Sequence, residues 1–167
     1  MTDPITRMSS ETPGVIAPPP LIALAAVVAG LVLDWLWPVN LLHAALGLPG
    51  RWAIGGLLMA SGLALAIFAE RTFHRIGTNA APWKPALNLA ASGPYAHTRN
   101  PMYLGLALFV AGLGIALASV WVLAMLVPAA LVLHFGVVRR EERYLERKFG
   151  DDYRAFKAAV PRYGWRW

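Results

Sequence analysis

Long uncharged runs, separated by segments that carry the charge, dominate the pattern along the chain. The longest, Met102–Val138, has 37 residues without Lys, Arg, Asp or Glu. As a single helix this run would measure about 55 Å, nearly twice the roughly 30 Å hydrocarbon core of a bilayer, so it must fold back. We expect the turn at Ala118-Ser119. The pattern therefore predicts an all-α integral membrane protein with four transmembrane helices, near residues 21–37, 52–69, 102–118 and 119–138.

Two features inside the predicted spans bear on helix packing. In the second span, Gly56, Ala60 and Ala64 recur every four residues and form a stripe of small side chains. Such a stripe favours close contact with a neighbouring helix. In the fourth span, Pro128 lacks the backbone donor that a helix interior needs, and we expect it to kink the helix.

The rest of the chain forms an arm and two segments that are too long to be simple connections. Residues 1–20 are expected to be a flexible N-terminal arm, and residues 21–167 a single membrane-embedded domain. Residues 70–101 contain several Gly and Pro breakers and are predicted to be irregular. Residues 139–167 are predicted to be mostly helical, with a break at Gly150.

Composition and charge support this topology. Hydrophobic residues make up 57% of the 167 residues and charged residues 14%, against about 45–50% and about 25% in soluble domains. The net charge is +6, and with both termini in the cytoplasm 14 of the 15 Lys and Arg residues lie on the cytoplasmic side. Only Arg51 lies on the other side. The positive-inside rule therefore predicts cytoplasmic termini. Because the charge lies at the ends of apolar runs, we expect the lipid bilayer as partner and no nucleic acid.

Several classes of chemistry are excluded early. The chain has no cysteine, which excludes disulfides, Cys-ligated zinc, iron–sulfur clusters and a thiol nucleophile. Its histidines lack metal-ligand spacing, and the motifs of the common hydrolases, metalloproteases and nucleotide-binding proteins do not occur. We therefore expect no metal site. The four histidines are His43, His74, His97 and His134.

The first candidate motif is Ser92–Gly105, at the start of the predicted third span. Gly93-Pro94 is typical of a turn, Asn100 is a good N-cap, and Pro101 suits the first helical position. A helix N-terminus with exposed backbone N–H groups favours an anion such as a carboxylate. The alternative is a membrane-entry turn with interfacial polar residues. In either case the motif brings three side chains to this helix end: His97, Arg99 and Tyr103.

The second candidate motif is the charged segment Arg139–Tyr153. A solvated helix with salt bridges along its surface is one interpretation. However, Glu142 falls on the same helical stripe as Val138, Leu145 and Phe149, so we expect it to face protein. An inward carboxylate requires a cationic partner, either a ligand ammonium group or a side chain such as that of Arg99.

Together the two motifs resemble the isoprenylcysteine carboxyl methyltransferase superfamily, which includes the phospholipid methyltransferases. The matching residues are Gly93-Pro94-Tyr95 with Arg99-Asn100-Pro101-Met102-Tyr103-Leu104-Gly105, and Glu141-Glu142 with Leu145, Phe149-Gly150 and Tyr153. The resemblance covers Phe73–Pro161 and includes Gly77-Thr78-Asn79, which is similar to a stretch common in bacterial members. It therefore implies a bacterial inner membrane. It implies that S-adenosylmethionine binds at the cytoplasmic side, between the start of the third span and the C-terminal helices, and leaves as S-adenosylhomocysteine.

The resemblance also implies a set of site residues. Those expected at the cofactor are Gly93, Pro94, Tyr95, His97, Arg99, Asn100, Tyr103, Leu104, Glu141 and Glu142. Of these, Arg99, Tyr103 and Glu142 are expected to act in catalysis. Arg99 would hold the cofactor's carboxylate, and Glu142 or Glu141 its ammonium group or ribose.

The expected reaction is direct methyl transfer to a hydrophobic or lipid-linked acceptor. Three acceptor groups fit the sequence equally: the carboxylate of a prenylcysteine-like compound, a phospholipid amine and a small thiol. No residue is an obvious general base; we interpret His97 as a hydrogen-bonding or capping group. The alternatives are an NADPH-dependent membrane reductase related to the sterol reductases, and a non-enzymatic scaffold or small transporter. The oligomeric state is left open.

Overall fold

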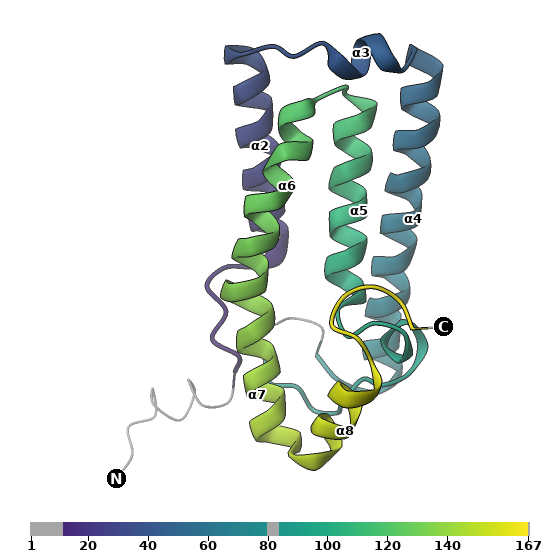
Figure 1. Ribbon diagram of the computed structural model, residues 1–167. Coiled ribbons are helices and arrows are strands. Elements are labelled where there is room, and N and C mark those ends of the chain that lie inside the picture. The colour runs from purple at the N-terminus through teal and green to yellow at the C-terminus, as the bar shows by residue number, and fades with distance from the viewer. Residues whose placement is uncertain (1–11, 80–83, 167) are drawn as a thin grey trace.

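The computed structural model describes residues 12–79 and 84–166, and all regular structure among them is helical. Most of the predicted arm, residues 1–20, therefore lies outside the described residues. Four long helices form a bundle: α2 (Pro19–Leu36), α4 (Leu48–Arg75), α5 (Pro101–Ala116) and α6 (Val120–Leu133) (Figure 1). The shorter elements are α3 (Leu41–Ala45), the 3-10 turn η1 (Gly93–Ala96), the π-helical turn η2 (His134–Val138), α7 (Arg139–Phe149) and α8 (Asp151–Ala159).

Three helices in the described part of the chain are long and apolar enough to cross a membrane. They are α2, α4 and the continuous helix Val120–Phe149, which joins α6, η2 and α7. The third predicted span forms the apolar helix α5, but its 16 residues give it a length of only about 24 Å. Each of the four predicted runs is thus helical, and three of them have the length and composition of a span.

Helix α5 packs against all three other long helices, and most closely against α4. Glycines allow this approach: a methyl group added at Gly55 would lie 2.6 Å from the carbonyl oxygen of Gly112, and one added at Gly105 would lie 2.6 Å from that of Gly62. The predicted stripe at Gly56, Ala60 and Ala64 is wrong, because a methyl group at Gly56 would meet no atom within 4 Å. The small face of α4 instead repeats every seven residues.

The reversal between α5 and α6 lies where the sequence predicts it. Ala118 adopts a positive φ of 55°, and the Ser119 side chain caps α6 by accepting a hydrogen bond from the Val122 N–H at 2.9 Å. Pro128 lies inside α6. Beyond it the helix changes to π geometry at His134–Val138 and then continues as α7.

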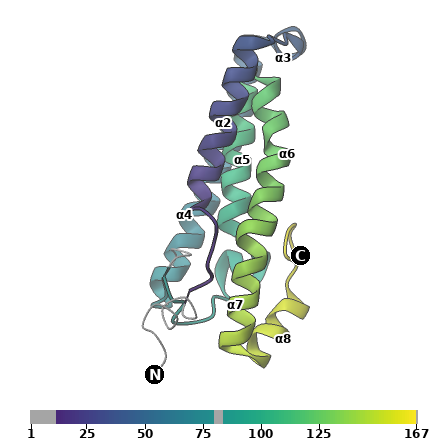
Figure 2. The same cartoon turned by 90° about the vertical axis from the view of Figure 1, so that its left-hand side faces the viewer.

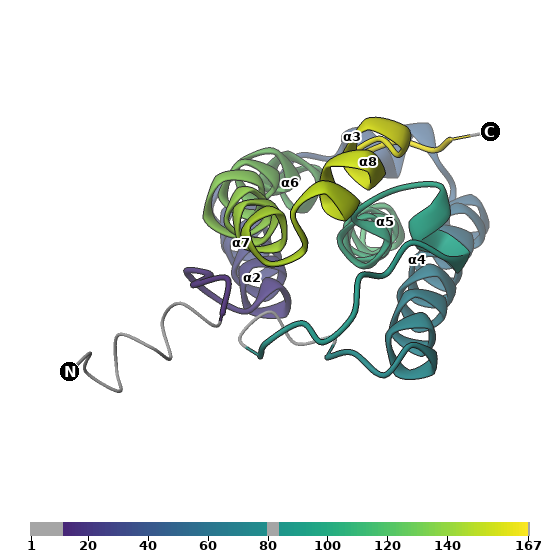
Figure 3. The same cartoon turned by 90° about the horizontal axis from the view of Figure 1, so that it is seen from below.

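The polar segments gather at one end of the bundle. Figures 1 and 2 show the connection from α4 to α5, together with α7 and α8, at the end from which α2 starts, while α3 lies at the opposite end. Residues 70–75 continue α4 as helix and are not part of the irregular segment. Seen from this end, α8 crosses beneath the bundle near α5 (Figure 3). Part of the N-terminal segment also lies here, since Ile16 N–H donates to Gly136 O at 3.2 Å.

Candidate functional site

A cavity lies at this polar end, bounded by the connection from α4 to α5, the first turn of α5, α7 and α8. It contains about 840 Å³ of space free of protein atoms, part of it open to solvent. Among the residues that line it are six of those expected at the cofactor: Tyr95, Arg99, Asn100, Tyr103, Glu141 and Glu142.

One wall of the cavity is a loop that is held in place by its own amide and hydroxyl groups. Thr78 Oγ1 accepts hydrogen bonds from the Leu87 and Asn88 N–H groups at 2.8 and 3.2 Å. Asn79 Nδ2 donates to Pro85 O at 2.8 Å. The stretch Gly77-Thr78-Asn79, which is part of the resemblance, therefore has two roles. Its hydrogen bonds support the wall, and Thr78 and Asn79 also line the cavity.

Turn η1 positions the next part of the wall. Gly93 has a positive φ of 57°, and a methyl group there would lie 2.9 Å from Thr72 Oγ1 on α4, so the turn needs glycine for both its conformation and its packing. Tyr95 follows, with 6% of its surface exposed, and its ring packs on Phe73 with centroids 4.8 Å apart. Burial raises the pKa of the Tyr95 hydroxyl, and the nearby Glu141 raises it further, so the group stays protonated.

The C-terminal segment after α8 is tied to the residues that lead into α5. Arg99 N–H donates to Pro161 O at 3.0 Å, and Asn100 Nδ2 donates to Arg162 O at 3.0 Å. His97 Nδ1 lies 2.7 Å from Arg166 O, and its ring stacks on Trp165 with centroids 4.6 Å apart. Asn100 occupies the predicted N-cap position, but its side chain bonds this segment and not the helix end.

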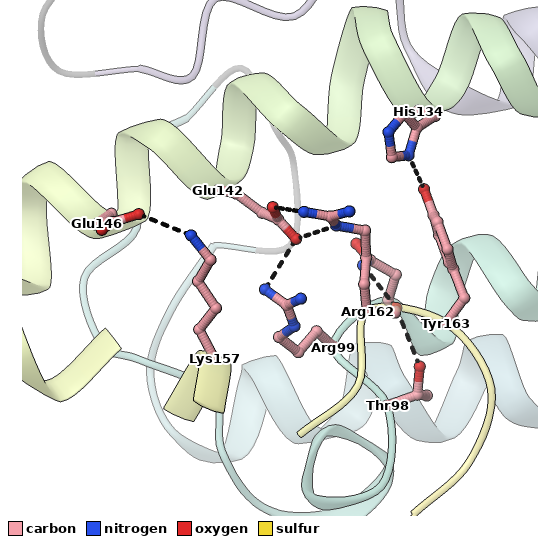
Figure 4. Close-up of polar contacts among 9 residues, drawn as sticks. Thr98, Arg99, His134, Glu142, Glu146, Lys157, Arg162 and Tyr163 are labelled. Carbon is pink, nitrogen blue, oxygen red and sulfur yellow. Dashed lines mark hydrogen bonds and ion pairs between the residues drawn. The ribbon is translucent and has the colours of Figure 1, made fainter. Parts of the chain in front are cut away.

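At the centre of the site, Glu142 is held by two arginines (Figure 4). Arg162 binds it through two hydrogen bonds of 2.7 Å, and Arg99 Nη1 lies 2.9 Å from its Oε1. Glu142 is 7% exposed, as its place on the α7 stripe predicts. Burial alone would raise the pKa of this carboxyl, but Arg162 and Arg99 outweigh it and lower the pKa, so Glu142 is ionised.

Arg99 keeps unused hydrogen-bonding capacity. Its side chain is 8% exposed, and its Nε is buried without a hydrogen-bond partner among the described residues. Its contact with Glu142 has the distance of an ion pair but not the alignment of a hydrogen bond. A buried guanidinium with an unsatisfied donor suits an anionic ligand group in the cavity.

Glu141 has different surroundings from its neighbour. Its Oε1 accepts a hydrogen bond of 2.7 Å from Tyr103 Oη, and no Lys or Arg of the described chain forms a salt bridge with it. Burial raises the pKa of Glu141 to about 7; the Tyr103 hydrogen bond lowers it and the charge of Glu142 raises it, each by less. This carboxyl therefore changes its protonation state near neutral pH.

The structure separates the expected site residues into two groups. Gly93, Pro94, His97 and Leu104 do not line the cavity: the first three form the turn and its contact with the C-terminal segment, and Leu104 belongs to α5. Sequence reasoning missed Arg162, which binds Glu142 from beyond the last helix. The sequence predicted that Glu142 is buried and offered Arg99 as its cationic partner. That prediction leaves room for a second cation but does not indicate which arginine supplies it.

The comparison with protein families agrees with this site. The family model described as phospholipid methyltransferase matches residues 51–152, which is more than half of the chain and reaches from α4 to the start of α8. Comparisons with curated proteins and with solved structures gave no match. The match confirms the resemblance carried by the two motifs, both of which border the cavity. The chain belongs to the phospholipid methyltransferase family.

Proposed function

We propose that the protein transfers a methyl group from S-adenosylmethionine to a hydrophobic or lipid-linked acceptor at the cytoplasmic face of a bacterial inner membrane. Both termini are cytoplasmic, and α5 completes a bundle of four spans. The observation that carries the proposal is Arg99, a buried guanidinium with an unsatisfied donor, at the wall of the cavity that five of the other expected site residues also line.

The residues present fit this cofactor. Arg99 holds its carboxylate, since an aligned anion satisfies the buried donor. Glu142 is ionised and keeps Arg99 in place, with Arg162 as second partner. Tyr95 and Asn100 supply polar contacts from the wall, and Glu141 is the carboxyl left for a cationic group.

The cofactor supplies an electrophilic methyl group on a sulfonium centre. The protein contributes orientation and exclusion of water, which together provide much of the rate of a direct displacement. An acceptor that enters from the bilayer reaches the cavity at its apolar end, where Met102 and Val138 lie on helices that continue into the bundle. The acceptor group is a carboxylate, an amine or a thiol.

Calorimetry in detergent tests the cofactor. We expect S-adenosylhomocysteine to bind and NADPH not to bind; the reverse result identifies a reductase, and no binding of either overturns the proposal in favour of a scaffold or transporter. Labelled cofactor with a lipid extract then identifies the acceptor.

The variant Arg99→Ala should raise the Kd for S-adenosylhomocysteine at least tenfold, because one charge-assisted contact is typically worth about 1.5–3 kcal/mol. The fold should survive, since Arg162 still neutralises Glu142. Arg143→Ala is the matched control: Arg143 is exposed, on α7, and among residues 12–79 and 84–166 it bonds only the carbonyl of Arg139 in its own helix. Equal affinities in the two variants would remove Arg99 from the cofactor site.

A further inference from the structure

The exposed side chains of the continuous helix Val120–Phe149 change from apolar to cationic at the polar end of the bundle. Its last exposed apolar side chains are spaced four apart: Val127, Leu131 and Phe135. The same spacing then continues with exposed arginines: Arg139, Arg143 and Arg147. The surface of this helix therefore passes from one suited to lipid to a charged one within a single turn.

Helix α4 shows the same change at the same end of the bundle. Leu63 and Ile67 are exposed, and the exposed arginines Arg71 and Arg75 continue their spacing of four. Seen from this end, α4 and α7 lie on either side of α5 (Figure 3). We call the five exposed residues the boundary arginines: Arg71, Arg75, Arg139, Arg143 and Arg147.

The boundary arginines differ from other cations of this end in having no acidic partner. Four other cations form salt bridges with carboxylates: Arg99, Arg154, Lys157 and Arg162. Within residues 12–79 and 84–166, no boundary arginine forms a salt bridge. The charge of the boundary arginines is therefore left for a partner outside this part of the chain.

Their spacing makes this lack of partners unfavourable in water. Like charges four residues apart on a helix repel each other, and both helices contain such pairs. The contacts between neighbours add no negative charge: Arg143 Nε donates to Arg139 O at 3.2 Å, and the Arg139 guanidinium lies 5.6 Å from the centre of the Phe135 ring. An anionic surface against these helices would remove the repulsion.

The depth of the boundary arginines matches the head-group layer of a bilayer. Trp52 and Arg71 are separated by about 29 Å of helix, and Trp121 and Arg139 by about 27 Å. Both lengths are close to the roughly 30 Å hydrocarbon core, and tryptophan is typical of the opposite interface. Arg71 and Arg139 therefore lie at the edge of the core, and the other boundary arginines lie one or two turns farther out.

We propose that the boundary arginines bind the head groups of anionic phospholipids in the leaflet at the cavity end of the bundle. A guanidinium binds phosphate oxygens through paired hydrogen bonds, and each basic side chain near an anionic leaflet adds to the attraction. A zwitterionic lipid offers the same phosphate beside an ammonium group that repels arginine. No boundary arginine lines the cavity, so these lipids are neighbours of the candidate site and the inference does not rest on methyl transfer.

The test is the lipid selectivity of the full chain in phosphatidylcholine bilayers, measured by electron paramagnetic resonance of spin-labelled lipids. At low salt, labelled phosphatidylglycerol should associate with the protein about fivefold more strongly than labelled phosphatidylcholine. In about 1 M NaCl, where charges are screened beyond about 3 Å, this ratio should fall toward one. A ratio of one at low salt would overturn the proposal.

Glutamine variants locate the selectivity. Arg71→Gln/Arg75→Gln should lower the ratio, and replacing the three boundary arginines of α7 by glutamine as well should bring it close to one. The fold should survive, because these positions are exposed and glutamine is a good helix former; helical circular dichroism checks it. A wild-type ratio in the variant with all five substitutions would exclude these arginines as the lipid site.

Arg154→Gln/Lys157→Gln is the matched control. It also removes two exposed cations, but these lie on α8 and already pair with Glu146, so the ratio should stay at the wild-type value. An equal fall in the control and in Arg71→Gln/Arg75→Gln would mean that selectivity follows net charge alone, against the proposal. Inorganic phosphate in place of chloride at equal ionic strength should not change the ratio; a fall would indicate a site for the free ion instead of the lipid.

Discussion

Glu141 and Glu142 follow one another on α7, and each responds to pH in its own way. The low pKa of Glu142 means that its ion pairs stabilise the fold above the ordinary range of a carboxyl and are lost as the pH falls. The high pKa of Glu141 has the opposite consequence. Burial of Glu141 is tolerated while its carboxyl is protonated. Once the carboxyl is ionised, its burial lowers the free energy of unfolding.

This contrast predicts that Glu141→Gln makes the protein more stable in alkaline solution. Below about pH 4.5 the carboxyl is protonated in both the folded and the unfolded chain, and the variant and the wild type should be equally stable. As the pH rises to about 7 the unfolded chain releases the proton before the folded one does, so the wild type loses stability and the variant does not. Above that pH the variant should be more stable by about 1–3 kcal/mol.

Thermal unfolding in detergent at pH 5 and at pH 8.5 measures this difference. Equal melting temperatures for the two proteins at pH 8.5 would show that Glu141 is well solvated, contrary to its place in the cavity wall.

The orientation of Glu142 could be predicted from the sequence, because the spacing from Val138 to Phe149 defines one face of a single helix. Its second partner could not. Arg162 is 20 positions away in the sequence, and the chain changes direction at Gly150 and leaves helical geometry at Val160 before it returns. Helical periodicity does not extend across two such breaks, so no pattern places Arg162 against Glu142.

Among the elements, the contact between α4 and α5 depends on glycines at the right helical phase. Gly55 and Gly56 are adjacent, but only Gly55 faces α5. The predicted stripe at Gly56, Ala60 and Ala64 was wrong because it was based on small residues spaced four apart within one helix. Gly55 and Gly62 are seven apart, as are Gly105 and Gly112 on the partner, and this matched spacing in two runs was the signal that indicates the contact.

The adjacent glycines give a matched pair of substitutions. In Gly55→Ala the new methyl group would lie 2.6 Å from Gly112 O and force α4 and α5 apart, at a cost of about 1–3 kcal/mol. In Gly56→Ala the methyl group meets nothing within 4 Å, and the better helix propensity of alanine should stabilise α4 by about 0.5–1 kcal/mol. Unfolding in detergent followed by helical circular dichroism measures both. Destabilisation by Gly56→Ala as large as that by Gly55→Ala would place the contact on the wrong face.

Helix ends were less predictable than helix positions. The apolar run in α4 stops at Ala69, yet the helix continues to Arg75 because Glu and Arg are good helix formers. Hydropathy therefore marks the boundary of the apolar environment, whereas Gly77, with a positive φ of 66°, marks the reversal of the chain. This difference of about one and a half turns determines where η1 can pack against Thr72.

Across the whole molecule, the charged residues and the cavity lie at the same end of the bundle. The end with α7, α8 and the α4–α5 connection carries most of the cationic side chains, and the end with α3 is close to Arg51 at the start of α4. The sequence predicted this division because charge follows the ends of apolar runs. It could not predict α3, because a helix of five residues is too short to show a periodic pattern of apolar positions.

If the positive-inside rule governs this molecule, the end of the bundle with the cavity is cytoplasmic. The chain has no cysteine, so single reporters can be added without removing any. Ala44→Cys in α3 and Ala158→Cys in α8 are matched substitutions at exposed positions at opposite ends of the bundle. In intact cells an impermeant maleimide should label only Ala44→Cys, and after permeabilisation it should label both. Labelling of Ala158→Cys alone in intact cells would invert the protein and place the cavity outside the cell.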